Sequence, residues 1–280
     1  MNNKVIIPVI LSDVQFSPTM EYYLSGYQWI DFREGDSTQR LIMRIKEIRG
    51  QIETKAEKPI HRNALPALER AMAGDSEAQF QLGKMYYYGA PGINKDFLEA
   101  VYWYTKAANA GNANAACNLG WCYETGNGTE QNWSKAFEWY TRSANAGNKV
   151  AKYSLGWMYE HGIFVPKNGT TAFRYFFDAA ELGHDISQYK VGLAYQNGTH
   201  VDQNYEKANH WFQCAAENSF VAAQYMLAEN YYWGRGVTSD IIKAKNMWIL
   251  SAEMGYMKSC EALEKYYDIF YNSEKKSFDV

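Results

Sequence analysis

AQFQLGKMYYYG, at residues 78–89, is the first of five similar stretches along this chain. The others are AACNLGWCYETG from Ala115, AKYSLGWMYEHG from Ala151, SQYKVGLAYQNG from Ser187 and AQYMLAENYYWG from Ala223, so successive starts lie 37, 36, 36 and 36 residues apart. Self-similarity at a fixed period of roughly 20–50 residues is typical of repeat architectures. The period therefore decides the fold class.

A second motif follows each copy of the first. It is EAVYWYTKAANAG at residues 99–111, and its counterparts end at Gly147, Gly183, Ser219 and Gly255. In the first motif Ala78, Leu82 and Tyr86 recur at i, i+4 and i+8, which places them on one face of a helix. The facing stripe of the second motif is formed by Ala100, Tyr104, Ala107 and Ala108. Neither helix buries its stripe alone, so neighbouring helix pairs must stack.

Glycine has two places in the pattern. Gly83 and its equivalents lie in the middle of the first helix, where glycine costs stability, so we expect them to let the partner helix approach closely. Ala228 takes this place in the fifth copy. Gly89 and its equivalents follow the first helix, where a positive φ ends a helix.

The two motifs together resemble the Sel1-like repeat of the tetratricopeptide superfamily, whose pattern is AxxxLGxxYxxG, a short loop and KAxxWYxKAAxxG. The resemblance implies a mainly all-α fold, a right-handed α-solenoid of helix-turn-helix repeats. We expect about twelve helices over residues 60–270, with no strand after residue 60 and with the tyrosines equivalent to Tyr86 facing the core. The expected divisions are a capping helix within 58–77, repeats at 78–114, 115–150, 151–186, 187–222 and 223–258, and a C-terminal capping helix at 259–270 followed by a frayed polar tail to residue 280.

Residues 1–57 follow a different pattern and are expected to form a small α/β segment. KVIIPVIL at 4–11 and YQWIDFR at 27–33 are typical of strands, and QRLIMRIKEIRGQI at 39–52 is typical of a helix. The IPVIL run, Pro18 and the WIDF run resemble the C-terminal third of a bacterial TIR domain. No glutamate matches the position of that family's catalytic residue, since Glu21, Glu34 and Glu47 lie elsewhere. A segment this small needs a covering surface, and homo-oligomerisation through it is one expectation.

Composition limits the classes of partner. The formal net charge is −3, and no run of Lys or Arg suggests a nucleic-acid partner. No stretch approaches the roughly 18 apolar residues of a membrane span. Pro8 and Asp13 argue against a secretory signal at the start, so a cytoplasmic location is expected, with the four cysteines reduced.

The sequence offers no recognisable catalytic motif. The histidines show no metal-ligand spacing, and no nucleophile elbow, phosphate loop or dinucleotide fingerprint occurs. We therefore predict no catalytic residue, no metal site and no cofactor.

Partner choice in such a scaffold is expected at the positions that vary between copies. The residue after the middle glycine and the residue four places earlier share a helix face beside the core stripe. These positions give the candidate partner-binding groove: Trp121, Tyr153, Trp157, Tyr189, Leu193 and Tyr225. Burial between repeats is the alternative reading of the same residues.

Three functions remain open from the sequence. The leading hypothesis is a non-enzymatic scaffold that binds a protein or peptide on the concave face of the solenoid. The TIR resemblance implies an alternative, a fragment of an NAD hydrolase of bacterial immunity whose repeats sense or oligomerise. The repeat resemblance implies another, an immunity protein that sequesters a toxin.

Overall fold

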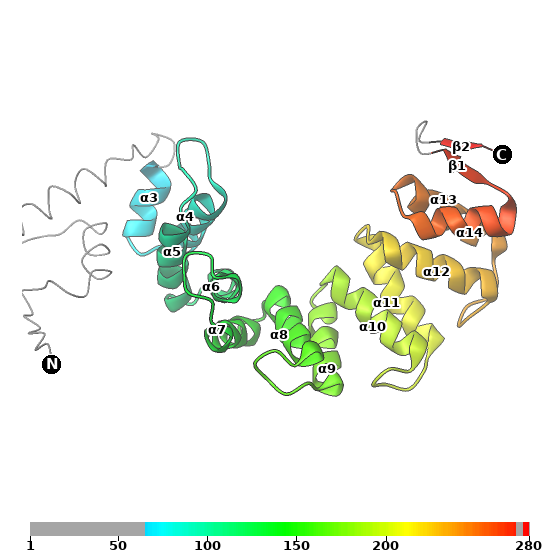
Figure 1. Ribbon diagram of the computed structural model, residues 1–280, viewed down its shortest axis with the longest axis horizontal. Helices are drawn as coiled ribbons and strands as arrows, with labels where there is room; N and C mark the ends of the chain where they lie inside the picture. Colours follow the sequence, from blue (N-terminus) through cyan, green and yellow to red (C-terminus); the bar gives the residue numbers. More distant parts are fainter. Residues whose placement is uncertain (1–64, 273–276, 280) are drawn as a thin grey trace, which may run out of the picture. The chain divides into compact units, whose positions relative to one another are not determined.

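The computed structural model describes residues 65–272 and 277–279, which hold twelve helices and two short strands (Figure 1). The TIR-like segment lies outside the described residues. The chain divides into two compact units, residues 1–110 and 111–280. The described elements of the first unit are α3 (Leu65–Met72), α4 (Ser76–Tyr88) and α5 (Phe97–Asn109).

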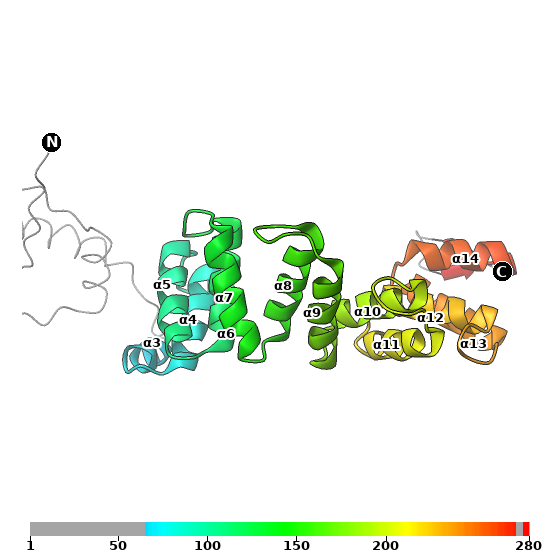
Figure 2. The ribbon, with the colours of Figure 1, turned by 90° about the horizontal axis from the view of Figure 1, so that it is seen from below.

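The second unit contains four complete helix pairs and a C-terminal cap. Its elements are α6 (Ala113–Thr125), α7 (Trp133–Asn145), α8 (Lys149–His161), α9 (Gly169–Glu181), α10 (Asp185–Asn197), α11 (Tyr205–Glu217), α12 (Val221–Trp233), α13 (Ile241–Glu253), α14 (Met257–Tyr267), β1 (Phe270–Asn272) and β2 (Ser277–Asp279). The two helices of each repeat pack together, and within the second unit the second helix of one repeat packs on the first helix of the next, as α9 does on α10 (Figure 2). This arrangement confirms the predicted helical repeat solenoid.

The second helix of every repeat begins at an Asp or Asn cap. The Asn168 side chain, for example, accepts a hydrogen bond from the backbone N–H of Thr171 at 2.9 Å. The same arrangement occurs at Asp96, Asn132, Asn204 and Asp240. Such a cap satisfies a backbone donor that the first helical turn leaves without a partner. The short polar residue before each second motif therefore fixes where that helix starts.

The glycine in the middle of the first helix is required by a ring on the second helix. A Cβ at Gly120 would lie 2.8 Å from the Tyr140 ring, and one at Gly156 would lie 2.7 Å from the Phe176 ring. Real Cβ atoms do not approach so closely, so the expected close approach of the helices is confirmed. The ring of Tyr140 is also held in place, because its hydroxyl donates a 2.6 Å hydrogen bond to the Glu124 carboxylate.

Aliphatic residues of the first helices form the centre of the core, and the recurring tyrosines pack around it. Leu119, Leu155 and Val191 are fully buried. Tyr159 is half-buried, with its ring 6.2 Å from that of Phe137 in the preceding repeat and 5.7 Å from that of Tyr175. The tyrosines were predicted to face the core; they are half-buried and pack against it from the seams between helices rather than point to solvent.

The C-terminal tail differs from the prediction. The predictions of a frayed end and of no strand after residue 60 were wrong, because β1 and β2 pair antiparallel with Tyr271 opposite Phe278. Phe and Tyr favour extended backbone, which explains why this short stretch forms a hairpin. The capping helix also ends early, at Tyr267, because Asp268 adopts a left-handed conformation with φ 55°. Among the described residues no helix has the length and apolar character needed to cross a membrane.

Candidate functional site

The first helices of the second unit present one variable face, which we call the first-helix face. It consists of three positions spaced i, i+7 and i+11 on α6, α8, α10 and α12, such as Val150, Trp157 and His161 on α8. These spacings return to the same side of a helix. Each of the six predicted groove residues occupies either the i+7 position of this face or the position four residues before it.

The two predicted tryptophans have different surroundings although they occupy equivalent positions. Trp121 on α6 is 48% exposed. Trp157 on α8 is half-buried, because the Trp133 ring stacks on it at 6.4 Å and 25° and the His161 ring stacks at 4.5 Å. Trp157 therefore belongs both to the first-helix face and to the packing between the second and third repeats.

The three predicted tyrosines lie at the seams between repeats. Tyr153 packs on Phe176 of its own repeat at 5.6 Å and on His184, the cap of the next first helix, at 4.8 Å. Tyr189 and Tyr225 have equivalent positions, beside Phe220 at 5.1 Å and Tyr256 at 5.5 Å respectively.

Burial raises the pKa of these phenols, that of Tyr225 to about 12. The neighbouring Glu229 carboxylate adds to the effect at Tyr225. These hydroxyl groups therefore stay protonated at neutral pH and are available as neutral hydrogen-bonding groups rather than as charges.

Leu193, the sixth predicted residue, lies beside two charged groups that connect successive repeats. The Lys190 ammonium on α10 contacts both oxygens of Glu160 on α8, at 2.8 and 3.0 Å. Its Nζ also lies 4.7 Å from the centre of the Phe176 ring. Both partners are partly exposed, so the pair contributes about 0–1 kcal/mol to stability and serves mainly to fix the geometry of the face.

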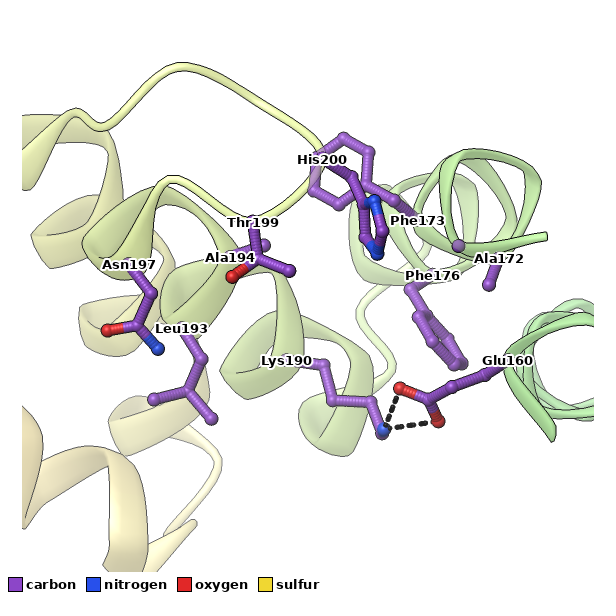
Figure 3. Close-up of a pocket in the computed structure, with 11 residues that line it drawn as sticks. Glu160, Ala172, Phe173, Phe176, Lys190, Leu193, Ala194, Asn197, Thr199 and His200 are labelled. Carbon is purple, nitrogen blue, oxygen red and sulfur yellow. Dashed lines mark hydrogen bonds and ion pairs between the residues drawn. The ribbon is translucent and has the colours of Figure 1, made fainter. Parts of the chain in front are cut away.

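A pocket of about 190 Å³ opens at this ion pair, and Figure 3 shows the side chains around it. Phe173 and Phe176 come from α9, Lys190 and Leu193 from α10, and Glu160 from α8. The loop after α10 supplies His200. Of the predicted groove residues, Leu193 is the one that lines this pocket.

The residues that create the pocket were not singled out from the sequence. The first residue of the second helix is large in four repeats, as Phe97, Trp133, Tyr205 and Ile241, but it is Gly169 in the third repeat. A Cβ at Gly169 would collide with the His200 imidazole. A comparison of the repeats at this one position was the available signal.

The cysteines and acidic residues show no arrangement for metal chemistry within the described part of the chain. Cys117 and Cys122 are free and buried, and burial raises the pKa of each thiol to about 12. Over residues 65–272 and 277–279 no group of three or more His, Cys, Asp or Glu side chains is placed to hold a metal ion. The two buried thiols therefore act as small apolar core residues.

Comparison with known proteins identifies Sel1 repeat proteins as relatives of this chain. The Sel1 repeat profile matches residues 76–112, 113–148, 149–184, 185–220 and 221–256. A Sel1 repeat protein from Oxalobacter formigenes is 28% identical, with a TM-score of 0.63 over 70% of this chain and 80% of that one. The protective antigen c5321 of uropathogenic Escherichia coli, which displays an SLR fold, is also 28% identical, with a TM-score of 0.54 over 72% of this chain and 52% of that one.

One relative is a curated eukaryotic protein. A stretch of 65 residues is 43% identical to the chitin synthase regulator SKT5 of Saccharomyces cerevisiae. That stretch is 23% of this chain and 9% of SKT5, so the chain spans a small part of its curated relative. Because the repeat profile matches well over half of the sequence, in five consecutive copies, the chain belongs to the Sel1 repeat family.

Proposed function

We propose that this protein is a non-enzymatic interaction scaffold that binds a protein or peptide on its first-helix face. The observation that carries the proposal is an exposed apolar residue on this face in each of four consecutive repeats. Trp121 is 48% exposed, Val150 45%, Ile186 37% and Trp233 51%. A repeated fold does not need these side chains at the surface, because the core is already filled by the buried positions.

The chemistry of the face fits a protein partner. Tryptophan and tyrosine carry much of the binding energy at protein interfaces, since they bury large areas while losing few rotamers. Polar groups on the same helices lie at positions next to the face: the Lys190–Glu160 pair and the phenols of Tyr153 and Tyr189. An apolar centre with polar groups around it is the usual composition of an interface.

The family and its members support the same proposal. Repeat scaffolds keep one backbone and vary the side chains on one face, and this is how the positions of Trp121, Trp157 and Leu193 behave here. SKT5 is described as a regulator of chitin synthase, a role exerted on another protein. We further propose a cytoplasmic location and no nucleic-acid partner, in keeping with the net charge of −3.

The other interpretations stay predictions. A toxin remains the second prediction for the kind of partner. The fragment of an NAD hydrolase and the oligomerisation contact both depend on residues 1–57, which lie outside the described residues.

Affinity capture with the full chain tests the proposal. The tagged protein is incubated with lysate of the source cells, and retained proteins are identified by mass spectrometry. A partner that the wild type retains should be lost from the Trp121→Ala variant, because this change removes an exposed aromatic side chain from the face. Trp139→Ala is the matched control, because Trp139 lies on the second helix α7 under the Arg142 guanidinium. Equal retention by all three proteins would place the binding surface elsewhere.

A further inference from the structure

The pocket between the third and fourth repeats can be compared with the preceding repeat junction of the same chain. Between the second and third repeats, the Trp133 indole lies on the Trp157 indole with the ring centres 6.4 Å apart. The equivalent residues one repeat later are Gly169 and Leu193. Both large rings are thus replaced by smaller groups, and the pocket of about 190 Å³ lies next to both of them.

The size and walls of the pocket suit one aromatic side chain. Pockets for drug-sized ligands measure roughly 300–1,000 Å³, so this one is too small for such a molecule and is of the order of a single large side chain. The Phe173 and Phe176 rings line it, and aromatic rings favour offset or edge-to-face contact with a further ring.

His200 gives the pocket a third ring wall at an energetic cost. Its backbone has φ 63°, in the left-handed region, where a side chain other than glycine costs about 1–3 kcal/mol. Glycine occupies the equivalent loop position in two other repeats, as Gly128 and Gly236. The imidazole reaches the pocket only because Gly169 has no Cβ. The two departures from the repeat pattern therefore act together at one place.

We propose that this pocket is a binding subsite for an aromatic side chain, tryptophan above all, of the protein or peptide partner. The inserted ring would pack against Phe173 and Phe176 beside Leu193, as the Trp133 indole packs on Trp157 at the preceding repeat junction. The inference rests on the proposed scaffold function and adds the kind of residue that the scaffold recognises. A cationic side chain fits less well, because the Lys190 ammonium already lies over Phe176 and Glu160 is already paired with it.

The pocket is tested without knowledge of the partner, using N-acetyl-L-tryptophanamide as the probe and N-acetyl-L-leucinamide and N-acetyl-L-lysinamide as comparison probes. Binding to the full chain is followed by saturation-transfer and chemical-shift titration in NMR. The tryptophan probe should bind the wild type at least about tenfold more tightly than the other two.

Two variants and a matched control locate the probe. Leu193→Trp places an indole beside the pocket, as Trp157 does one repeat earlier, and should weaken the tryptophan probe by about tenfold or more. Glu229→Trp makes the same type of change at the equivalent position of the fifth repeat and should leave the affinity within about twofold of the wild type. His200→Gly removes a wall and should weaken binding several-fold while the melting temperature holds or rises, since it relieves a left-handed residue.

The outcomes separate the subsite from the scaffold function. Equal binding of the probe to wild type, Leu193→Trp and His200→Gly would overturn the subsite. Absence of a preference for the tryptophan probe would overturn it as well. Either result leaves the capture experiment with Trp121→Ala standing, whereas a failed capture together with pocket-specific probe binding would count against the scaffold function alone.

Discussion

Replacement of Trp157 by alanine separates the two roles that the structure gives this residue. Truncation of a fully buried Trp to Ala costs about 3–5 kcal/mol of stability. Because Trp157 is half-buried, the loss of its buried surface should cost about 2 kcal/mol. Loss of the stacked pair with Trp133 adds roughly 0.5–1.5 kcal/mol. The free energy of unfolding should therefore fall by about 2.5–3.5 kcal/mol, which lowers the melting temperature by roughly 5–14 °C for a unit of this size.

Trp121→Ala is the matched variant, because Trp121 occupies the equivalent position with about half of its side chain exposed. Its stability cost should stay near or below about 1 kcal/mol. Thermal melts followed by circular dichroism and urea titrations measure both variants under the same conditions. Binding of the captured partner is then measured by calorimetry at a temperature where both variants are folded.

If the first-helix face binds the partner, both variants should lose about 1–3 kcal/mol of binding free energy, which is typical when an aromatic residue at an interface is truncated. The packing role predicts that only Trp157→Ala loses much stability. A large melting shift for Trp157→Ala together with unchanged affinity per folded molecule would remove Trp157 from the binding surface. Unchanged affinity for both variants would refute the assignment of the face.

Further predictions concern packing, pH and chemistry. Gly156→Ala should destabilise the chain by about 1–3 kcal/mol in urea titrations, because the new Cβ overlaps the Phe176 ring; a neutral effect would contradict the packing argument. Burial lowers the pKa of His184, so the neutral ring is favoured on folding, and stability should fall as the pH drops below about 6.5. His184→Asn, which copies the cap of α8, should flatten that loss between about pH 7 and pH 5, and an unchanged pH profile would show that another group is responsible. The purified chain should release no nicotinamide from NAD, and turnover that survives repeated purification would contradict the non-enzymatic proposal.

The helices were predictable from the sequence because the same local pattern recurs in all five repeats. The middle glycines, the tyrosines at the seams and the polar residues before the second helices all act within one repeat or with the next one. The tail was not predictable in this way, since nothing in the repeats constrains residues 268–280. The left-handed Asp268 and the short hairpin after it depend on local backbone preferences that the periodic pattern does not contain.

The sequence predicted which repeat positions make up the candidate site, but not how exposed the side chains at those positions are. Trp121 and Trp157 occupy the same repeat position, yet the Trp133 ring covers one face of Trp157. The burial of Trp157 depends on Trp133, the first residue of the preceding second helix, which lies 24 residues earlier in the chain. A pattern that aligns each motif with its own copies does not show such a contact between two different motifs. Gly169 and the pocket beside it were missed for the same reason.

Phe164 and His200 both depart from the glycine that other repeats have at this loop position. Both occupy the same loop position with φ 63°, so both carry the cost of a left-handed backbone. The Phe164 ring lies 5.6 Å from that of Phe137, and this contact offsets part of the cost within the fold itself. The His200 imidazole instead lies over Gly169 at the edge of the pocket, and the residue is exposed. A strained residue whose own packing returns little stability is better explained by what the pocket binds than by what the fold requires.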